Sequence, residues 1–208
     1  MSVRLQGQLL LVGAIGAILA SLLIFLLPGP DGLGGPGSIP TNVVFVISGF
    51  FLLVGLPALY RAQAKRMGIL GLAGVVLLWV ATVLLLLVLS FVQILDLTIP
   101  SSIPHPGGEG PPPLAIIPMI LGVVLTVIGG VIVGITTIRA HVFAAAIGWI
   151  ILVSPVLLLL RAPVGGLLGV MLTSICLGLF YAGLAWVGAI LSFRGNPTQV
   201  SQSSVQRN

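Results

Sequence analysis

The chain has 208 residues, of which 58% are hydrophobic and 5% are Asp, Glu, Lys or Arg. Water-soluble domains carry about 25% charged residues, so this composition excludes an ordinary soluble domain. The formal net charge of +5 is compatible with nucleic-acid binding, but the few basic residues are scattered, mostly at the ends of apolar runs, where membrane proteins place them. We therefore expect a membrane protein with no nucleic-acid partner.

Six apolar runs are about as long as the roughly 20 residues that a helix needs to cross a bilayer. The sequence thus predicts an all-α fold, a single polytopic membrane helix bundle with six transmembrane helices over residues 1–193. Residues 194–208 follow as a polar cytoplasmic tail. The predicted spans cover residues 6–27, 42–60, 68–94, 114–138, 142–160 and 165–193.

The connections between the predicted spans favour one orientation. Two hairpin turns are short and basic, RAQAKRM at 61–67 and RAH at 139–141, whereas the connectors 28–40 and 98–113 are rich in Pro and Gly. An even number of spans places both termini on one side, and the positive-inside rule assigns the basic side to the cytoplasm. Only Arg161 then lies outside, together with Asp31, Asp96 and Glu109, and seven basic residues are cytoplasmic: Arg4, Arg61, Lys65, Arg66, Arg139, Arg194 and Arg207.

The two basic hairpins also share a local pattern, Tyr60-Arg61-Ala62 and Ile138-Arg139-Ala140. Either a duplicated hairpin or convergent composition explains it. In composition the hairpins resemble those of many small multi-pass bacterial proteins, a likeness that covers the hairpins alone and implies no activity. We expect a multi-pass protein of a bacterial or archaeal cytoplasmic membrane, with both termini in the cytoplasm.

Small residues recur at four-residue spacing in three of the predicted spans. Inside lipid, helices associate through close backbone approach at such residues rather than through the hydrophobic effect. Packing within the bundle is the favoured interpretation of any single stripe, and an interface with a partner or a second copy is the other. The stripes are Gly13, Ala17 and Ser21; Thr126, Gly130 and Gly134; and Gly165, Gly169 and Thr173, which Gly178 and Ala182 continue.

No constellation in the sequence points to catalysis or metal binding. The spans contain no internal Asp, Glu, Lys or Arg, the groups that ion-coupled carriers usually place near mid-membrane. Asp96 and Arg161, near the outer ends of two spans, form a possible ion pair. His105 and His141 fall on opposite sides and cannot share a metal ion, and Cys176 has no base in its span. We expect no metal, no cofactor and no enzymatic activity.

Three tryptophans lie inside spans rather than at their ends. Trp149 and Trp186 are expected at similar depth in adjacent spans, where we predict that they contact each other. Such residues usually fill space between helices. Together with His141, they are nevertheless weak candidates for binding a pigment, a quinone or a lipid.

These observations leave three hypotheses for function. The first is a non-catalytic accessory or scaffolding subunit of a larger membrane assembly, whose partners are lipid and other transmembrane helices in a homo- or hetero-oligomer. The alternative is a channel or permease for a small neutral or apolar solute, and a weaker alternative is a lipid- or pigment-binding protein. Hydroxyls that converge on a cavity would favour a permease, and hydroxyls bonded to their own preceding turns would favour a scaffold. The relevant residues are Ser48, Thr82, Thr126, Thr137, Ser154, Thr173 and Ser174.

Overall fold

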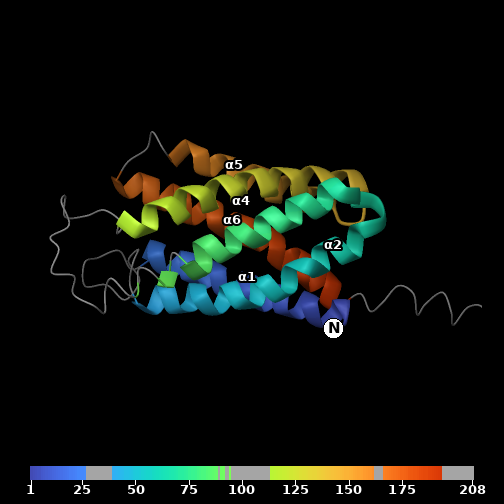
Figure 1. Cartoon of the computed structure of the whole chain (residues 1–208), viewed down its shortest axis with the longest axis horizontal. Helices are drawn as coiled ribbons and strands as arrows, with labels where there is room; N and C mark the ends of the chain where they lie inside the picture. The colour runs from blue at the N-terminus through green and yellow to red at the C-terminus, as the bar shows by residue number, and fades with distance from the viewer. Residues whose placement is uncertain (27–38, 89, 92–93, 95–112, 162–165, 194–208) are drawn as a thin grey trace, which may run out of the picture.

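The computed structural model describes residues 1–26, 39–88, 90–91, 94, 113–161 and 166–193. Over these residues the fold is helical, and none of them lies in a strand. The helices run side by side along the long axis of the molecule (Figure 1). In chain order they are α1 (Val3–Leu26), α2 (Ile39–Thr82), the π-helix η1 (Val83–Val88), α4 (Pro113–Ala140), α5 (Ala145–Leu157), the 3-10 helix η2 (Leu158–Arg161) and α6 (Gly166–Phe193).

Among the described residues, five helical segments are long and apolar enough to cross a membrane. Within lipid, each backbone N–H and C=O needs a partner inside the chain, and an uninterrupted helix supplies nearly all of them. The chain is therefore a multi-pass membrane protein built as a helix bundle. The segments are Val3–Ile24, Ile39–Ala64, Arg66–Val88, Ile116–Ala140 and Met171–Phe193.

The helix in the region of the predicted span 142–160 is shorter than expected. Residues 141–144 form the turn after α4, so α5 begins only at Ala145 and has 13 residues. The four 3-10 residues of η2 continue it. At about 1.5 Å per α-helical residue and about 2.0 Å per 3-10 residue, α5 and η2 together extend roughly 28 Å. This length is close to the about 30 Å hydrocarbon thickness of a bilayer.

The first basic hairpin is helical almost to its apex. The prediction placed a turn over 61–67, but these residues extend the first half of α2, because Ala, Gln, Lys and Arg are good helix formers. The chain reverses at Gly68, with φ 60° and ψ −160°. This backbone conformation is essentially restricted to glycine. The long helix α2 is thus two antiparallel spans joined at one residue, at the right-hand end of Figure 1.

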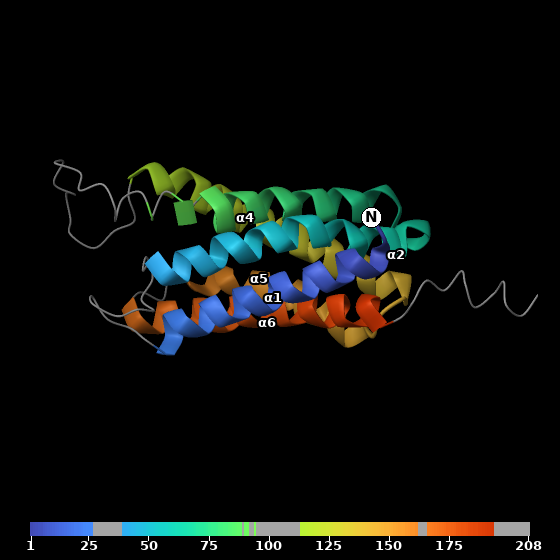
Figure 2. The ribbon, with the colours of Figure 1, turned by 90° about the horizontal axis from the view of Figure 1, so that it is seen from below.

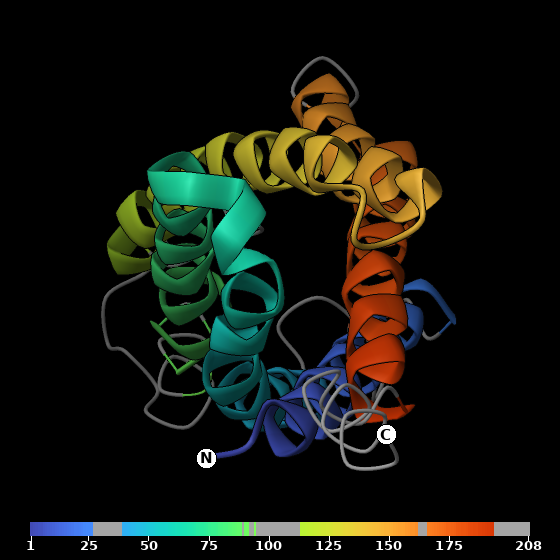
Figure 3. The same ribbon diagram turned by 90° about the vertical axis from the view of Figure 1, so that its right-hand side faces the viewer.

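The helices form a ring around a common axis, as the view from one end shows (Figure 3). α1 packs between α6 and the first half of α2, the second half of α2 packs on α4, and α5 packs between α4 and α6. The view from below shows α1 and α6 side by side (Figure 2). The axis of the ring is therefore surrounded by four helices and by both halves of α2.

Glycines allow these neighbours to approach closely. A Cβ atom on Gly13 would lie 2.7 Å from the Leu52 nitrogen, and one on Gly134 would lie 2.6 Å from Leu152 Cβ. A Cβ atom on Gly130 would lie 2.6 Å from Pro155 Cγ. Ala17 and Ser21 are also buried. The small residues of α1 and α4 therefore pack against other helices of the same chain.

One end of the bundle gathers the basic residues, and we call it the basic end; it carries Arg4, Arg61, Arg66 and Arg139. The N-terminus, the Gly68 turn, the turn after α4 and the end of α6 all lie there, at the right of Figure 1. Arg61 Nη1 donates to Gln6 Oε1 at 3.2 Å, which ties α2 to α1. Arg66 Nη1 donates to the Ala140 carbonyl oxygen at 2.9 Å.

Candidate functional site

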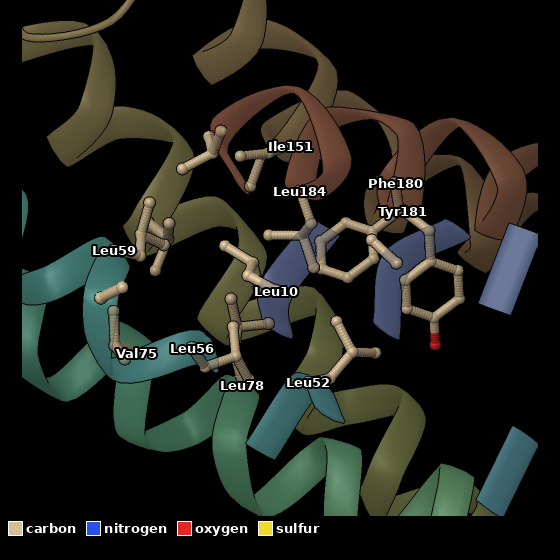
Figure 4. Close-up of a cluster of buried hydrophobic side chains, with 14 of the residues drawn as sticks. Leu10, Leu52, Leu56, Leu59, Val75, Leu78, Ile151, Phe180, Tyr181 and Leu184 are labelled. Atoms are coloured by element: carbon tan, nitrogen blue, oxygen red, sulfur yellow. The ribbon is translucent and has the colours of Figure 1, made fainter. Parts of the chain in front are cut away.

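The axis of the ring is closed by an apolar layer. Leu10, Leu59 and Leu184 are at most 2% exposed, and they come from α1, α2 and α6. Each lies roughly 10–14 Å along its helix from the basic end, at about 1.5 Å per residue. Their side chains point toward one another, together with Leu56, Leu78 and Ile151 (Figure 4). Buried leucine side chains from three helices therefore meet at this depth along the axis.

Beyond this layer, a small cavity lies between α2, α4 and α6. Its volume is about 20 Å³, which is room for about one water molecule. Three hydroxyl-bearing side chains line it, Thr82 from α2, Thr126 from α4 and Tyr181 from α6, and the rest of the wall is apolar. These three residues lie roughly 18–21 Å from the basic end, near the middle of the spans.

The three hydroxyls of the cavity differ in their hydrogen bonds. Thr82 Oγ1 donates to the Leu78 carbonyl oxygen and Thr126 Oγ1 to the Gly122 carbonyl oxygen, both at 2.8 Å. Tyr181 is only 6% exposed, and among the described residues its hydroxyl has no hydrogen-bond partner. Its ring packs edge-on against Phe180, with centroids 5.6 Å apart (Figure 4). The phenol is therefore almost buried, and its hydroxyl has no hydrogen-bond partner among the described residues.

The remaining hydroxyls named by the sequence do not join this cavity. Ser48 Oγ donates to the Val44 carbonyl, Ser154 Oγ to the Ile150 carbonyl and Thr173 Oγ1 to the Gly169 carbonyl, all within their own helices. Thr137 and Ser174 are buried, and neither lines the cavity. Only Thr82 and Thr126 of the predicted set therefore meet, and five of the seven hydroxyls bond to their own preceding turn.

Sequence reasoning missed several polar residues of the interior, among them Gln63 and Tyr181. Gln63 is 1% exposed, and within the described part of the chain neither its amide nitrogen nor its amide oxygen has a hydrogen-bond partner. Its position in a segment expected to be a turn hid its burial. Tyr181 was missed because a single tyrosine in an apolar span has no periodic signal. A polar tip on a residue in mid-span was the one available clue, since buried Tyr hydroxyls usually need a partner.

The aromatic and histidine candidates do not form a common site. Trp149 and Trp186 are 55% and 49% exposed, and within the described part of the chain no ring contact joins them. Trp79 Nε1 donates to the Leu53 carbonyl oxygen at 3.1 Å, which pairs the two halves of α2. His141 is exposed in the turn after α4, with a positive φ of 51°.

Some predicted features fall outside the described residues. They are Gly165, Asp31, Asp96, His105, Glu109, the side chains of Lys65 and Arg161, and the tail 194–208. Gly169 of the same α6 stripe is described and is buried. The possible Asp96–Arg161 ion pair therefore stays a prediction.

The described residues define a class, a multi-pass membrane helix bundle with an apolar layer across its axis and a small cavity whose lining includes three hydroxyl-bearing residues. Comparisons with protein-family models, with curated proteins and with solved structures found no match.

Proposed function

We propose that this chain is a non-catalytic accessory or scaffolding subunit of a larger membrane assembly. The observation that supports this most is the closed axis. Conduction needs polar groups that line a path through the membrane depth. Here buried leucines of the apolar layer meet on the axis, and five of the seven hydroxyls named by the sequence bond to their own helices. This arrangement favours a scaffold over a channel or permease.

The outward face of α6 offers a surface for a partner helix. A Cβ atom on Gly178 would meet nothing within 4 Å, and Ala182 one turn later is exposed. Ile175 and Trp186 flank them and are each about half exposed. Small residues four apart on an open face allow close approach of another transmembrane helix. The stripes of α1 and α4, in contrast, are covered by the chain's own helices.

The basic end supports an orientation with both termini in the cytoplasm of a bacterial or archaeal cell. Cytoplasmic loops carry an excess of Lys and Arg. Arg61 bonds to Met1 and Gln6 and Arg66 to Ala140, so these two arginines lie at this end with Arg4 and Arg139, which are close to those partners in the sequence. The three acidic residues of the chain, Asp31, Asp96 and Glu109, belong to connectors between the spans or to their ends. In this orientation the partner surface on α6 lies within the bilayer.

The test is purification in mild detergent at native expression level, followed by mass spectrometry of whatever co-migrates. We expect a complex that Gly178→Leu dissociates while the unfolding temperature of the chain is retained, because the new side chain projects from an open face. Ala146→Leu is the matched control, a small-to-large change at an exposed position of α5, and it should leave the complex intact.

Two results would contradict the proposal. One is a lone monodisperse species for the wild-type chain in every mild detergent tried. The other is faster entry of a small neutral solute, such as glycerol, into sealed vesicles that contain the chain than into protein-free vesicles. The second result would favour the permease instead.

A further inference from the structure

We propose that the cavity between α2, α4 and α6 is a binding site for a single water molecule, held by Tyr181, Thr126 and Thr82 inside the membrane-spanning bundle. The proposal does not depend on the function proposed above. It concerns a molecule bound in the interior, whereas the scaffold proposal concerns the outer face of α6.

The unsatisfied hydroxyl of Tyr181 is the first support. A hydroxyl removed from water without a replacement hydrogen bond is costly, and an apolar wall offers none. Buried polar groups in proteins are nearly always satisfied, either by the protein or by an ordered water. Tyr181 is almost fully buried, lines the cavity and has no partner among the residues that the structure describes.

The two threonines provide the complementary acceptors. Each Thr hydroxyl proton is already used in a bond to a carbonyl of its own helix, while its oxygen keeps lone pairs that can accept. A water in the cavity can accept from the Tyr181 phenol and donate to Thr82 and Thr126. It would thus make three hydrogen bonds, the usual number for a buried water.

The chemistry and the size of the cavity select a small neutral molecule. An anion would need several free donors, and the lining offers one hydroxyl proton that is not already bonded to a helix carbonyl. The volume of about 20 Å³ exceeds the about 10–15 Å³ that one water needs, and it only reaches the lower end of the about 20–30 Å³ that two waters would need.

The place of the cavity gives the water a structural role. α2 and α6 lie across the ring from each other, and α4 closes the side between them (Figure 3). A water bonded to Thr82, Thr126 and Tyr181 links one residue of each helix. It would connect three spans at a depth where the surrounding contacts are apolar.

The experiment is water-edited solid-state NMR on the full chain in lipid vesicles, with ¹³C-labelled Tyr and Trp. In a Tyr60→Phe background, Tyr181 is the only tyrosine. Trp186, in the same helix and half exposed to the outside, serves as the internal reference. We expect magnetisation from water to reach the Tyr181 ring sooner than the Trp186 ring. The difference should be lost in the double variant Thr82→Val and Thr126→Val.

Thr173→Val is the matched control, because this hydroxyl also bonds to its own helix but does not line the cavity. It should leave the Tyr181 signal unchanged. If Tyr181 receives water magnetisation no sooner than Trp186 in the otherwise wild-type chain, the cavity is dry and the proposal is wrong. An equal loss in the Thr173→Val control would also overturn it, because the signal would then report general loosening of the bundle.

Discussion

At Gly68 the backbone conformation of a single residue decides the path of the chain. A φ of 60° with ψ of −160° is open to glycine and costly for residues that have a Cβ atom. The surrounding space is not the constraint, because a Cβ atom there would meet nothing within 4 Å. Gly178 also has open space around its Cβ position, but it lies in regular helix. Glycine is therefore required at position 68 by the backbone conformation, whereas neither the backbone nor the packing within the chain requires it at position 178.

We predict opposite effects of alanine at these two positions. Gly68→Ala should lower the free energy of unfolding by about 1–3 kcal/mol, because alanine is strained in that conformation. Gly178→Ala should raise it by about 0.5–1 kcal/mol, because alanine is the better helix former. Unfolding in detergent with increasing SDS, followed by circular dichroism, measures both. Equal effects of the two substitutions would show that Gly68 does not require its special conformation.

Gly68 and Gln63 also show which features of single residues could not be predicted from the sequence. The glycine at 68 was placed at the start of a span, since nothing local distinguished it from the other 27 of the 28 glycines. Gln63 was predicted to be in a turn and is buried in a helix. The place of Gly68 and the burial of Gln63 both depend on the residue at which the chain reverses direction. That position is set by tertiary packing as well as by the local preference of each residue.

At the scale of elements, Arg66 connects the two basic turns. Its guanidinium donates to the carbonyl of Ala140, the last residue of α4. The last carbonyls of a helix have no intrahelical partner and favour a nearby cation. The sequence alone indicates only that Arg66 helps to set the orientation of the chain in the membrane. The structure adds a contact that holds the α2 hairpin to the end of α4.

Removing this contact should loosen the basic end. We expect Arg66→Ala to lower the free energy of unfolding by about 1 kcal/mol, the net value of one hydrogen bond to a partly exposed group. It should also speed hydrogen exchange of the backbone amides in the turn that follows α4. Arg4→Ala is the control, since Arg4 is exposed at the same end and makes no hydrogen bond within the described residues. Similar effects of both variants would mean that loss of charge, rather than loss of this contact, is responsible.

At the scale of the whole molecule, the sequence predicted the helical bundle, and five helices of the described residues are long and apolar enough to cross a membrane. Length and apolar composition suffice for this, because a bilayer requires about 20 apolar residues per helix. The order of helices around the ring and the inward faces were not predictable. A helix that is apolar on all sides has no periodic pattern to show which side is buried. Trp149 and Trp186, predicted to touch, have no ring contact with each other within the described residues.

The account depends most on the bundle crossing the membrane with its basic end on one side. Single cysteines in a Cys176→Ala background test this directly, with an impermeant maleimide applied to sealed vesicles of known orientation. Ala144→Cys reports the turn at the basic end, and Ser101→Cys reports the connector before α4. We predict that the two positions react from opposite sides of the membrane, and that Ala144→Cys reacts from the cytoplasmic side. Reaction of both positions from the same side would contradict the account.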